Sequence, residues 1–348
     1  MELQRVVGRA VGDGMMFNQQ EEGAVLRRLA KLGDRVLDPS IVFAFDQTGF
    51  NRHRIQFDET DLSVDMTGRV CLVTGANSGL GKATAMALAR RGASVWLLCR
   101  SRTRGREAAE EIRAQTGNGQ VFVDEVDVSD PDSIAAFVER LELPWVDVLV
   151  NNAGVLMSNR VDAESGLETT LATNVVGPIQ LTAALLPYLR AGTRSRVIFV
   201  SSGGMYTQRL NVDRLAEPPS PFDGVNAYAQ SKRAMVELSR RIAVPLAKAG
   251  VSVQCMHPGW ANTPGVERSI PGFWRLTKTI LRTPEAGADT IVWLSVCDKS
   301  IEYPGSFWFD RKQRKIHLLP GTDSSAKMKN RLWENTHHWA GLEPSVWE

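Results

Sequence analysis

Residues 69–81, RVCLVTGANSGLG, join a run of β-branched and apolar side chains to a cluster of glycines. A helical stretch, GKATAMALARR, follows at once with its alanines and leucine on one face. Glycines in such a strand–turn–helix unit permit a tight turn and let the backbone approach a pyrophosphate, and the helix N-terminus presents N–H groups to that charge. Taken alone, the pattern also fits a plain strand-to-helix turn.

Six further runs of strand length follow this turn, separated by amphipathic helical stretches. The predicted strands are residues 69–74, 94–99, 121–126, 146–151, 196–201, 251–256 and a last one near 306–309. This alternation predicts repeated βαβ units, and therefore an α/β fold: a Rossmann-type, doubly wound sheet of seven parallel strands with helices on both faces. We expect one catalytic domain over residues 67–310, a helical N-terminal extension over 1–66 and a C-terminal tail over 311–348. The tail holds three tryptophans, too many for a solvated linker.

The composition narrows the classes of function. The 348 residues carry a net charge of +2 with 43% hydrophobic side chains, which excludes a disordered or collagen-like chain and argues against nucleic acid as a partner. Four cysteines lie in apolar runs without the spacing of metal ligands, so we expect reduced thiols and no metal site. The first twenty residues lack the apolar core of a secretory signal, and we expect a cytoplasmic protein. Residues 169–189 are uncharged, but their Asn, Gly, Pro, Gln and Thr content favours a buried or interface helix over a membrane span.

The glycine spacing Thr74-Gly-x-x-x-Gly-x-Gly81 resembles the cofactor turn of the classical short-chain dehydrogenases/reductases. The rest of that family's pattern follows in order: Asp127, Asn151-Asn152-Ala153-Gly154, Asn174, Ser202, Tyr228-x-x-x-Lys232 and Pro258-Gly259. The resemblance covers about residues 69–309, and the stretches PFDGVNAYAQSK and MHPGWANTPG are most similar to the dehydrogenase/reductase member 12 subgroup, near the retinol-dehydrogenase-like enzymes. It implies hydride transfer between a nicotinamide cofactor and a carbonyl or alcohol.

The charge after the second predicted strand indicates which nicotinamide cofactor is used. An NAD enzyme offers a carboxylate to the ribose 2′-hydroxyl about twenty residues beyond the glycine turn. This chain has Arg100 there, and a guanidinium matches the 2′-phosphate of NADP(H). The alternative is a solvated basic loop. With the residues that the resemblance implies, the predicted cofactor site is Gly75, Asn77, Ser78, Gly79, Leu80, Gly81, Arg100, Asp127, Val128, Asn152, Ala153, Gly154, Tyr228, Lys232, Pro258, Gly259, Trp260 and Thr263.

Tyr228 and Lys232 stand four residues apart in helical sequence, so their side chains share a face. A lysine ammonium within a few ångströms of a phenol, joined by the cationic nicotinamide of the oxidised cofactor, favours the phenolate, and we expect the pKa of Tyr228 to fall below its ordinary value of about 10. The resemblance implies that Tyr228 is the acid/base on the substrate oxygen, that Lys232 tunes it and binds ribose, and that Ser202 hydrogen-bonds the same oxygen. Ser201 is the structural one of the two adjacent serines.

Asn174 completes the predicted catalytic set. In the family its main-chain carbonyl holds a water that links the lysine to solvent. Four residues later this chain has Pro178, which has no N–H and cannot bond that carbonyl. The proline therefore either keeps the carbonyl available for the water or only kinks the helix.

Two segments are expected to shape the substrate pocket. Residues 210–224, LNVDRLAEPPSPFDG, are proline-rich and aperiodic and predict a loop. Residues 265–282 alternate apolar and basic side chains, which fits an apolar substrate lid, an ordinary amphipathic surface helix or, less well for a nearly neutral chain, a face resting on a membrane. We expect a small hydrophobic carbonyl or alcohol as substrate. The resemblance implies a homodimer or homotetramer paired through the helices that contain Asn174 and Tyr228.

Two other functions fit parts of the pattern. A nucleotide-sugar epimerase or dehydratase of the extended branch is suggested by length, but its turn is normally spaced Gly-x-x-Gly-x-x-Gly. A catalytically silent, cofactor-sensing binding protein would keep the fold, but such proteins usually lose the tyrosine or the lysine, and this chain has both.

Overall fold

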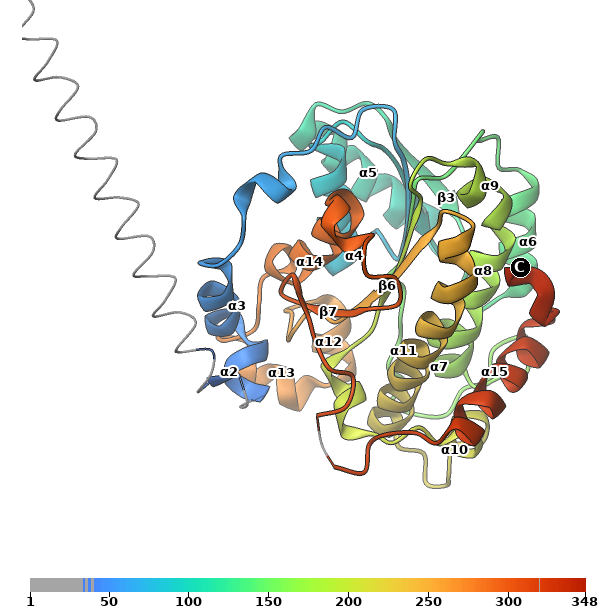
Figure 1. Ribbon diagram of the computed structural model, residues 1–348. Helices are drawn as coiled ribbons and strands as arrows, with labels where there is room; N and C mark the ends of the chain where they lie inside the picture. Colours follow the sequence, from blue (N-terminus) through green and yellow to red (C-terminus); the bar gives the residue numbers. More distant parts are fainter. Residues whose placement is uncertain (1–33, 35–36, 39–40, 319) are drawn as a thin grey trace, which may run out of the picture. The chain divides into compact units, whose positions relative to one another are not determined.

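A computed structural model describes residues 34, 37–38, 41–318 and 320–348, which divide into two compact units at Asp58/Glu59 (Figure 1). The described part of the first unit holds two short helices, α2 (Ile41–Phe45) and α3 (Gln47–Arg54). Asp46 begins α3, because its side chain accepts a hydrogen bond of 2.9 Å from the N–H of Gly49. This part of the predicted N-terminal extension is helical, and most of the rest lies outside the described residues.

The second unit is built on one eight-stranded sheet with the order β3-β2-β1-β4-β5-β6-β7-β8. The strands are β1 (Val70–Thr74), β2 (Ser94–Cys99), β3 (Val121–Glu125), β4 (Val148–Asn151), β5 (Arg196–Val200), β6 (Ser252–Met256), β7 (Phe307–Phe309) and β8 (Lys312–Gln313). Strands β1 to β7 pair in parallel, which confirms the predicted doubly wound sheet. The eighth strand pairs antiparallel with β7. The sequence pattern predicts only seven strands, because the two residues of β8 are too few to show a periodicity.

Helices cover both faces of this sheet (Figure 1). The helices in the described part of this unit are α4 (Gly79–Ala89), α5 (Arg102–Thr116), α6 (Pro131–Glu139), α7 (Thr169–Leu171), α8 (Gly177–Ala184), α9 (Leu186–Ala191), α10 (Val212–Ala216), α11 (Gly224–Lys248), α12 (Pro264–Ser269), α13 (Pro271–Thr277), α14 (Pro284–Val296) and α15 (Ala326–Ala340). Helix α4 packs against α5 and α14, and α8 packs against α6. The expected loop at residues 210–224 contains α10, which Asn211 caps by accepting a bond from the N–H of Arg214.

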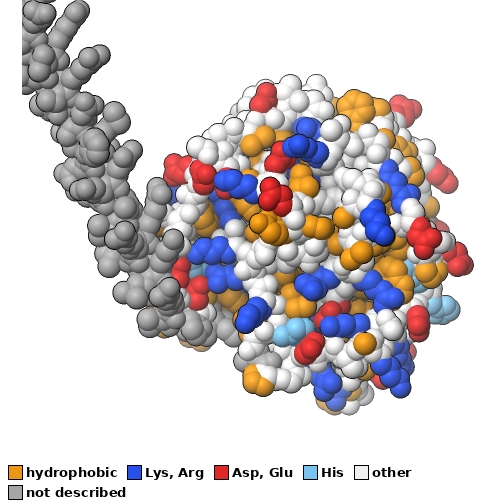
Figure 2. All heavy atoms as spheres, in the orientation of Figure 1, with side chains coloured by type: hydrophobic (Ala, Val, Ile, Leu, Met, Phe, Trp, Pro, Cys, Tyr) orange, Lys and Arg blue, Asp and Glu red, His pale blue; other side chains and the backbone are white. Residues whose placement is uncertain are grey.

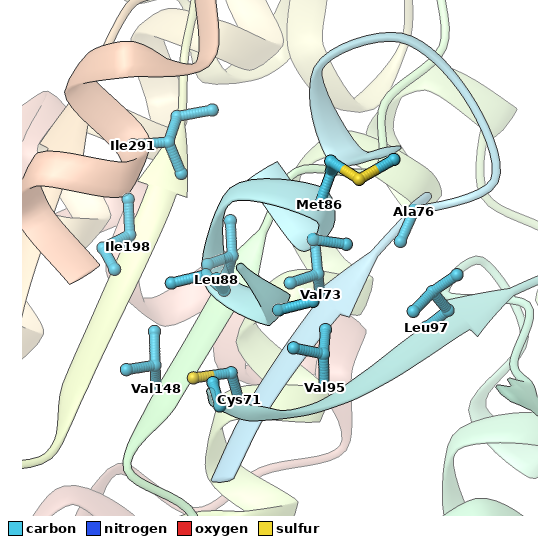
Figure 3. Packing of buried hydrophobic residues seen from close by; sticks show 14 of the residues in the cluster. Cys71, Val73, Ala76, Met86, Leu88, Val95, Leu97, Val148, Ile198 and Ile291 are labelled. Atoms are coloured by element: carbon cyan, nitrogen blue, oxygen red, sulfur yellow. The ribbon is translucent and has the colours of Figure 1, made fainter. Parts of the chain in front are cut away.

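The core on the α4 side of the sheet explains why β1 is apolar throughout. Every residue of β1 is buried, as expected for a central strand covered on both faces. Figure 3 shows side chains from β1, β2, β4 and β5 meeting Leu88 of α4 and Ile291 of α14. All four cysteines are free and buried, and burial raises the pKa of the Cys71 thiol, which makes it unreactive.

The C-terminal tail packs through α15, which contacts α8 and α11. Trp347 is 1% exposed and its indole N–H donates to Nε2 of His337 at 2.8 Å. Gln180 of α8 donates to the carbonyl of Ala340 at 3.0 Å. The tail therefore covers part of the face through which the resemblance implies subunit pairing, and the homodimer or homotetramer stays a prediction.

The uncharged run at residues 169–189 is divided among α7, a π-helical turn (η2, Ala172–Val176), α8 and α9. Over the part of the chain that the structure describes, no helix is both long and apolar enough for a bilayer span. On the face of the molecule seen in Figure 2, basic side chains lie among acidic ones and neither sign dominates. This distribution fits the net charge of +2.

Candidate active site

Most of the predicted site residues that follow strands lie at the carboxyl ends of four neighbouring strands, β1, β4, β5 and β6, whereas Arg100 follows β2 and Asp127 follows β3. The glycine turn follows β1, Asn152 follows β4, Ser202 follows β5 and Pro258 follows β6. In parallel sheets these ends share one edge, and ligands bind in the crevice where the strand order reverses. That reversal lies here between β1 and β4.

The turn after β1 has the backbone that the glycine spacing predicts. Gly75 and Gly79 have φ values of +63° and +54°, which side chains other than glycine rarely adopt. A Cβ on Gly81 would lie 2.5 Å from the carbonyl oxygen of Gly75. Ser78 precedes α4 without capping it through its side chain, so its hydroxyl does not take up the first N–H groups of the helix. The turn therefore fits a pyrophosphate.

Leu80 and Asn77 have structural contacts within this turn. The side chain of Leu80 packs against the hydrophobic core. The backbone of Asn77 hydrogen-bonds the Cys99 thiol at the end of β2. These contacts hold the turn against the sheet and leave the cofactor roles of both residues as predictions.

Thr74 is a residue that sequence reasoning did not assign to the site. Its hydroxyl oxygen accepts hydrogen bonds of 2.9 Å from the N–H groups of Asn152 and Ala153. The Asn152 side chain in turn donates to the carbonyl of Thr74 at 2.8 Å. Thr74 thus joins the glycine turn to the turn after β4. Its signal in the sequence was a hydroxyl at the end of an otherwise apolar strand.

Arg100 lies at the end of β2 with 65% of its side chain exposed. Its Nε is 3.8 Å from a carboxylate oxygen of Asp127, whose other oxygen accepts bonds from the N–H and hydroxyl of Ser129. Val128 next to it is buried. The guanidinium is thus held loosely and remains available to a phosphate.

Tyr228 and Lys232 lie on the first turns of α11, and Ser202, which follows β5, lies beside the tyrosine. The Ser202 side chain hydrogen-bonds the phenol of Tyr228. The Lys232 ammonium lies 5.6 Å from the centre of the Tyr228 ring and donates to the carbonyl of Val200 at 2.9 Å. The Ser201 hydroxyl donates instead to the backbone carbonyl of Lys232, at 3.0 Å. Ser201 is therefore in a structural contact and Ser202 lies at the phenol, while the role of Ser202 toward the substrate oxygen stays a prediction.

Burial governs the pKa values of Tyr228 and Lys232. Burial raises the pKa of its phenol above the ordinary value, and the hydrogen bond with Ser202 opposes that effect. Burial also lowers the pKa of Lys232, to about 8. Desolvation therefore dominates at the phenol among the protein's own groups, and the predicted fall in the tyrosine pKa, which counts the positive charge of the oxidised nicotinamide as well as that of Lys232, stays a prediction.

Asn174 lies in the π-helical turn η2, where Gly177 donates its N–H to the carbonyl of Ala172, five residues back. The Asn174 side chain accepts from the N–H of Val155 at 2.8 Å and donates to the Val155 carbonyl at 2.9 Å and to Ser231 at 3.0 Å. A Cβ on Gly154 would lie 3.2 Å from both the Asn174 side chain and the Lys232 ammonium. Asn174 is thus beside the lysine, and the water on its carbonyl stays a prediction.

The segment after β6 reaches back to the glycine turn. Gly259 has φ +76°, and a Cβ on Gly79 would lie 3.2 Å from the side chain of Thr263. The predicted lid forms two short helices, α12 and α13, because Pro271 begins a new helix. Trp260 and Phe273 meet edge to face at 5.3 Å between ring centroids. Trp260 lies in the segment Pro258–Thr263, which is predicted to bind the cofactor and is called the nicotinamide segment below, and it therefore contacts the lid.

The outer surface of the lid is exposed. Leu276 is 84% exposed, Arg268 and Arg275 are exposed beside it in sequence, and the Lys278 ammonium lies 5.4 Å from the centre of the Trp274 ring. The basic outer face that the sequence predicted is present.

Comparison with known proteins matches the family model for short chain dehydrogenases over residues 69–271. The chain is 42% identical over 293 residues to dehydrogenase/reductase SDR family member 12 of Bos taurus, covering 83% of this chain and 92% of that protein. It is 34% identical over 290 residues to retinol dehydrogenase 12 of Homo sapiens, covering 82% of this chain and 90% of that protein.

Solved structures of short-chain dehydrogenases and reductases are also similar to this chain. L-sorbose reductase from Gluconobacter frateurii, complexed with NADPH and L-sorbose, is similar with a TM-score of 0.57 and 26% identity over 71% of this chain and 97% of that one. A short chain dehydrogenase from Shigella flexneri gives a TM-score of 0.58 and 27% identity over 74% and 96%.

Proposed function

Because the chain belongs to the short-chain dehydrogenase/reductase family, we propose that it is an NADP(H)-dependent oxidoreductase acting on the carbonyl or alcohol of a hydrophobic substrate. One observation carries the proposal: a hydrogen-bonded serine and tyrosine with a buried lysine stand on the sheet edge that also holds the glycine turn. When bound, the nicotinamide would supply or accept the hydride.

The protein's own groups would handle the proton. Because burial raises the pKa of Tyr228, the phenol keeps its proton at neutral pH and is a proton donor to a carbonyl oxygen. Ser202, already hydrogen-bonded to that phenol, would hold the same oxygen. Lys232, with a pKa of about 8, carries its charge through neutral pH and stabilises the tyrosine oxygen once the proton has left. This arrangement favours carbonyl reduction.

The glycine turn and its neighbours would hold the cofactor. The left-handed backbone at Gly75 and Gly79 lets the chain approach a pyrophosphate, and the start of α4 directs N–H groups to it. The exposed guanidinium of Arg100 would bind the 2′-phosphate of NADP(H). The names of the similar solved structures support this assignment, since L-sorbose reductase was crystallised with NADPH.

The substrate is proposed to be hydrophobic. Trp260 and Phe273 pack together between the nicotinamide segment and the lid, and neighbouring Ile270 is half-buried. Apolar and aromatic walls with a few polar groups are typical of small-molecule sites. The retinol dehydrogenases among the similar proteins support a hydrophobic alcohol or aldehyde.

A fluorescence titration of the purified protein with NADPH and NADH tests the proposal without a known substrate. Charge-assisted hydrogen bonds to the 2′-phosphate, at about 1.5–3 kcal/mol, predict that NADPH binds roughly 10- to 150-fold tighter. Arg100→Met should remove most of that difference. Arg106→Met, on the exposed face of α5, is the matched control and should keep it. Binding of neither nucleotide would contradict the proposal, and binding without turnover on any carbonyl would favour the cofactor-sensing alternative.

A further inference from the structure

The two ends of the lid lie side by side, where residues 260–262 pair with Arg282; this pairing is called the lid neck below. The N–H of Asn262 donates to the carbonyl of Arg282 at 2.8 Å, and the N–H of Arg282 donates to the carbonyl of Trp260 at 2.7 Å. Ala261 and Arg282 form an isolated parallel bridge at the same place. Residues 263–281, which include α12 and α13, therefore form a loop segment whose two ends are joined by hydrogen bonds at Arg282.

The side chain of Arg282 is held by a buried ion pair. Its exposed fraction is 1% and that of Asp310 is 2%. Two parallel bonds join them, Nη1 to Oδ1 at 2.6 Å and Nη2 to Oδ2 at 2.8 Å, and Nη1 also donates to the carbonyl of Pro258 at 3.3 Å. Asp310 begins the two-residue turn between β7 and β8, with φ +49°. The pair thus connects the lid neck, the segment after β6 and the sheet edge.

An aromatic stack continues from this pair to the start of the nicotinamide segment. The guanidinium lies 4.8 Å from the centre of the Phe309 ring, and Phe309 stacks on His257 at 4.1 Å and 10°. Nδ1 of His257 accepts a bond of 3.2 Å from the N–H of Gly259, in agreement with the neutral ring that burial produces. The backbone at Pro258 and Gly259 is therefore held by two hydrogen bonds, one from the Arg282 guanidinium to the Pro258 carbonyl and one from the Gly259 N–H to the His257 ring.

The chemistry of the pair points to positioning rather than to packing. Taking two charges out of water is expensive, and apolar residues of similar size often stabilise a fold as well as a buried ion pair does. A bidentate pair adds direction, because both partners must lie in one plane at a fixed distance. Here that direction acts on the Pro258 carbonyl and on the lid neck at once.

We propose that Arg282 and Asp310 are positioning residues, which fix the segment Pro258–Thr263 against the nicotinamide and set the closed position of the lid over the substrate. The assignment of that segment to the nicotinamide rests on the proposed function. The lid neck itself does not. Breaking the pair should loosen the lid and misplace the substrate while the rest of the sheet stays intact.

The test uses the double substitution Arg282→Met with Asp310→Leu, which removes both charges and keeps apolar volume, so that no unpaired charge is buried. The matched control is Arg311→Met with Asp289→Leu. That pair is also bidentate, at 2.8 and 2.6 Å, and ties the same turn to α14 rather than to the lid neck. Amide hydrogen exchange of the lid, the dissociation constant for NADPH, and the KM and kcat for a carbonyl substrate are measured for both.

We expect lid amides to exchange at least about tenfold faster in the first variant, with strands β1 to β5 unchanged, and KM to rise at least about fivefold. Arg282→Lys keeps the positive charge but cannot form the two parallel hydrogen bonds of a guanidinium, so it should give an intermediate increase in lid exchange and KM. Lid exchange equal to wild type would overturn the proposal. An equal increase in lid exchange in the Arg311 control would also overturn it, because the effect would then come from disturbing the turn between β7 and β8 rather than from the Arg282–Asp310 pair. If wild-type protein binds no NADPH, the proposed function fails, whereas hydrogen exchange still decides the role of the pair.

Discussion

Replacing Gly81 by alanine tests the geometry of the glycine turn. A Cβ at this position would lie 2.5 Å from the carbonyl oxygen of Gly75 and 2.6 Å from Nδ2 of Asn152. The first atom is backbone. The second cannot swing away freely, since it donates to the Thr74 carbonyl at 2.8 Å. Because real Cβ atoms essentially never lie closer than 3.0 Å to such an atom, the backbone would have to move by about 0.5 Å.

The magnitude depends on which part of the protein takes up that movement. Overpacking of this kind costs about 1–3 kcal/mol. If the whole domain absorbs it, the melting temperature should fall by about 2–4 °C for each kcal/mol. If the turn opens instead, its N–H groups are misaligned with the pyrophosphate, and the loss of charge-assisted bonds of about 1.5–3 kcal/mol weakens NADPH binding by roughly 10- to 150-fold.

Thermal unfolding and an NADPH fluorescence titration of the same preparation separate these two results. The control is Gly119→Ala, because no heavy atom lies within 4 Å of a Cβ there, and it should stay within about 0.5 kcal/mol of wild type. Gly81→Ala with wild-type melting temperature and wild-type NADPH affinity would refute the reasoning, since the strain would then have no measurable consequence.

Three further results are expected. Tyr228→Phe should abolish carbonyl reduction and keep NADPH binding within about threefold, as measured by steady-state rates and titration, and an unchanged rate would contradict the assigned proton donor. Because burial lowers the pKa of Lys232 to about 8, its ammonium loses the proton as pH rises through that value, so the reduction rate should be level in neutral solution and fall above about pH 8; a rate that rises there would be inconsistent. Gly177→Ala places a Cβ 1.7 Å from the carbonyl oxygen of Val128 and should lower the free energy of unfolding by at least about 3 kcal/mol in urea, whereas a loss below about 0.5 kcal/mol would show that α8 can move freely.

Local spacing was enough to predict the elements that carry the site. The turn at Gly75–Gly81 and the strand that precedes it both follow from residues within a few positions of one another. The four-residue interval between Tyr228 and Lys232 likewise placed both on one face of α11. Such features depend on backbone geometry over one or two turns, which neighbouring residues determine.

The contacts that join these elements needed the tertiary structure. Thr74 bonds the backbone of Asn152, 78 positions away, and Arg282 pairs with Asp310 across 28 positions, so no local pattern identifies the partner in either contact. The effect of burial on the pKa of Tyr228 was beyond the sequence for the same reason. A nearby lysine is visible in sequence, but desolvation sums the burial contributed by every element packed around the phenol, and only the folded chain brings those elements together.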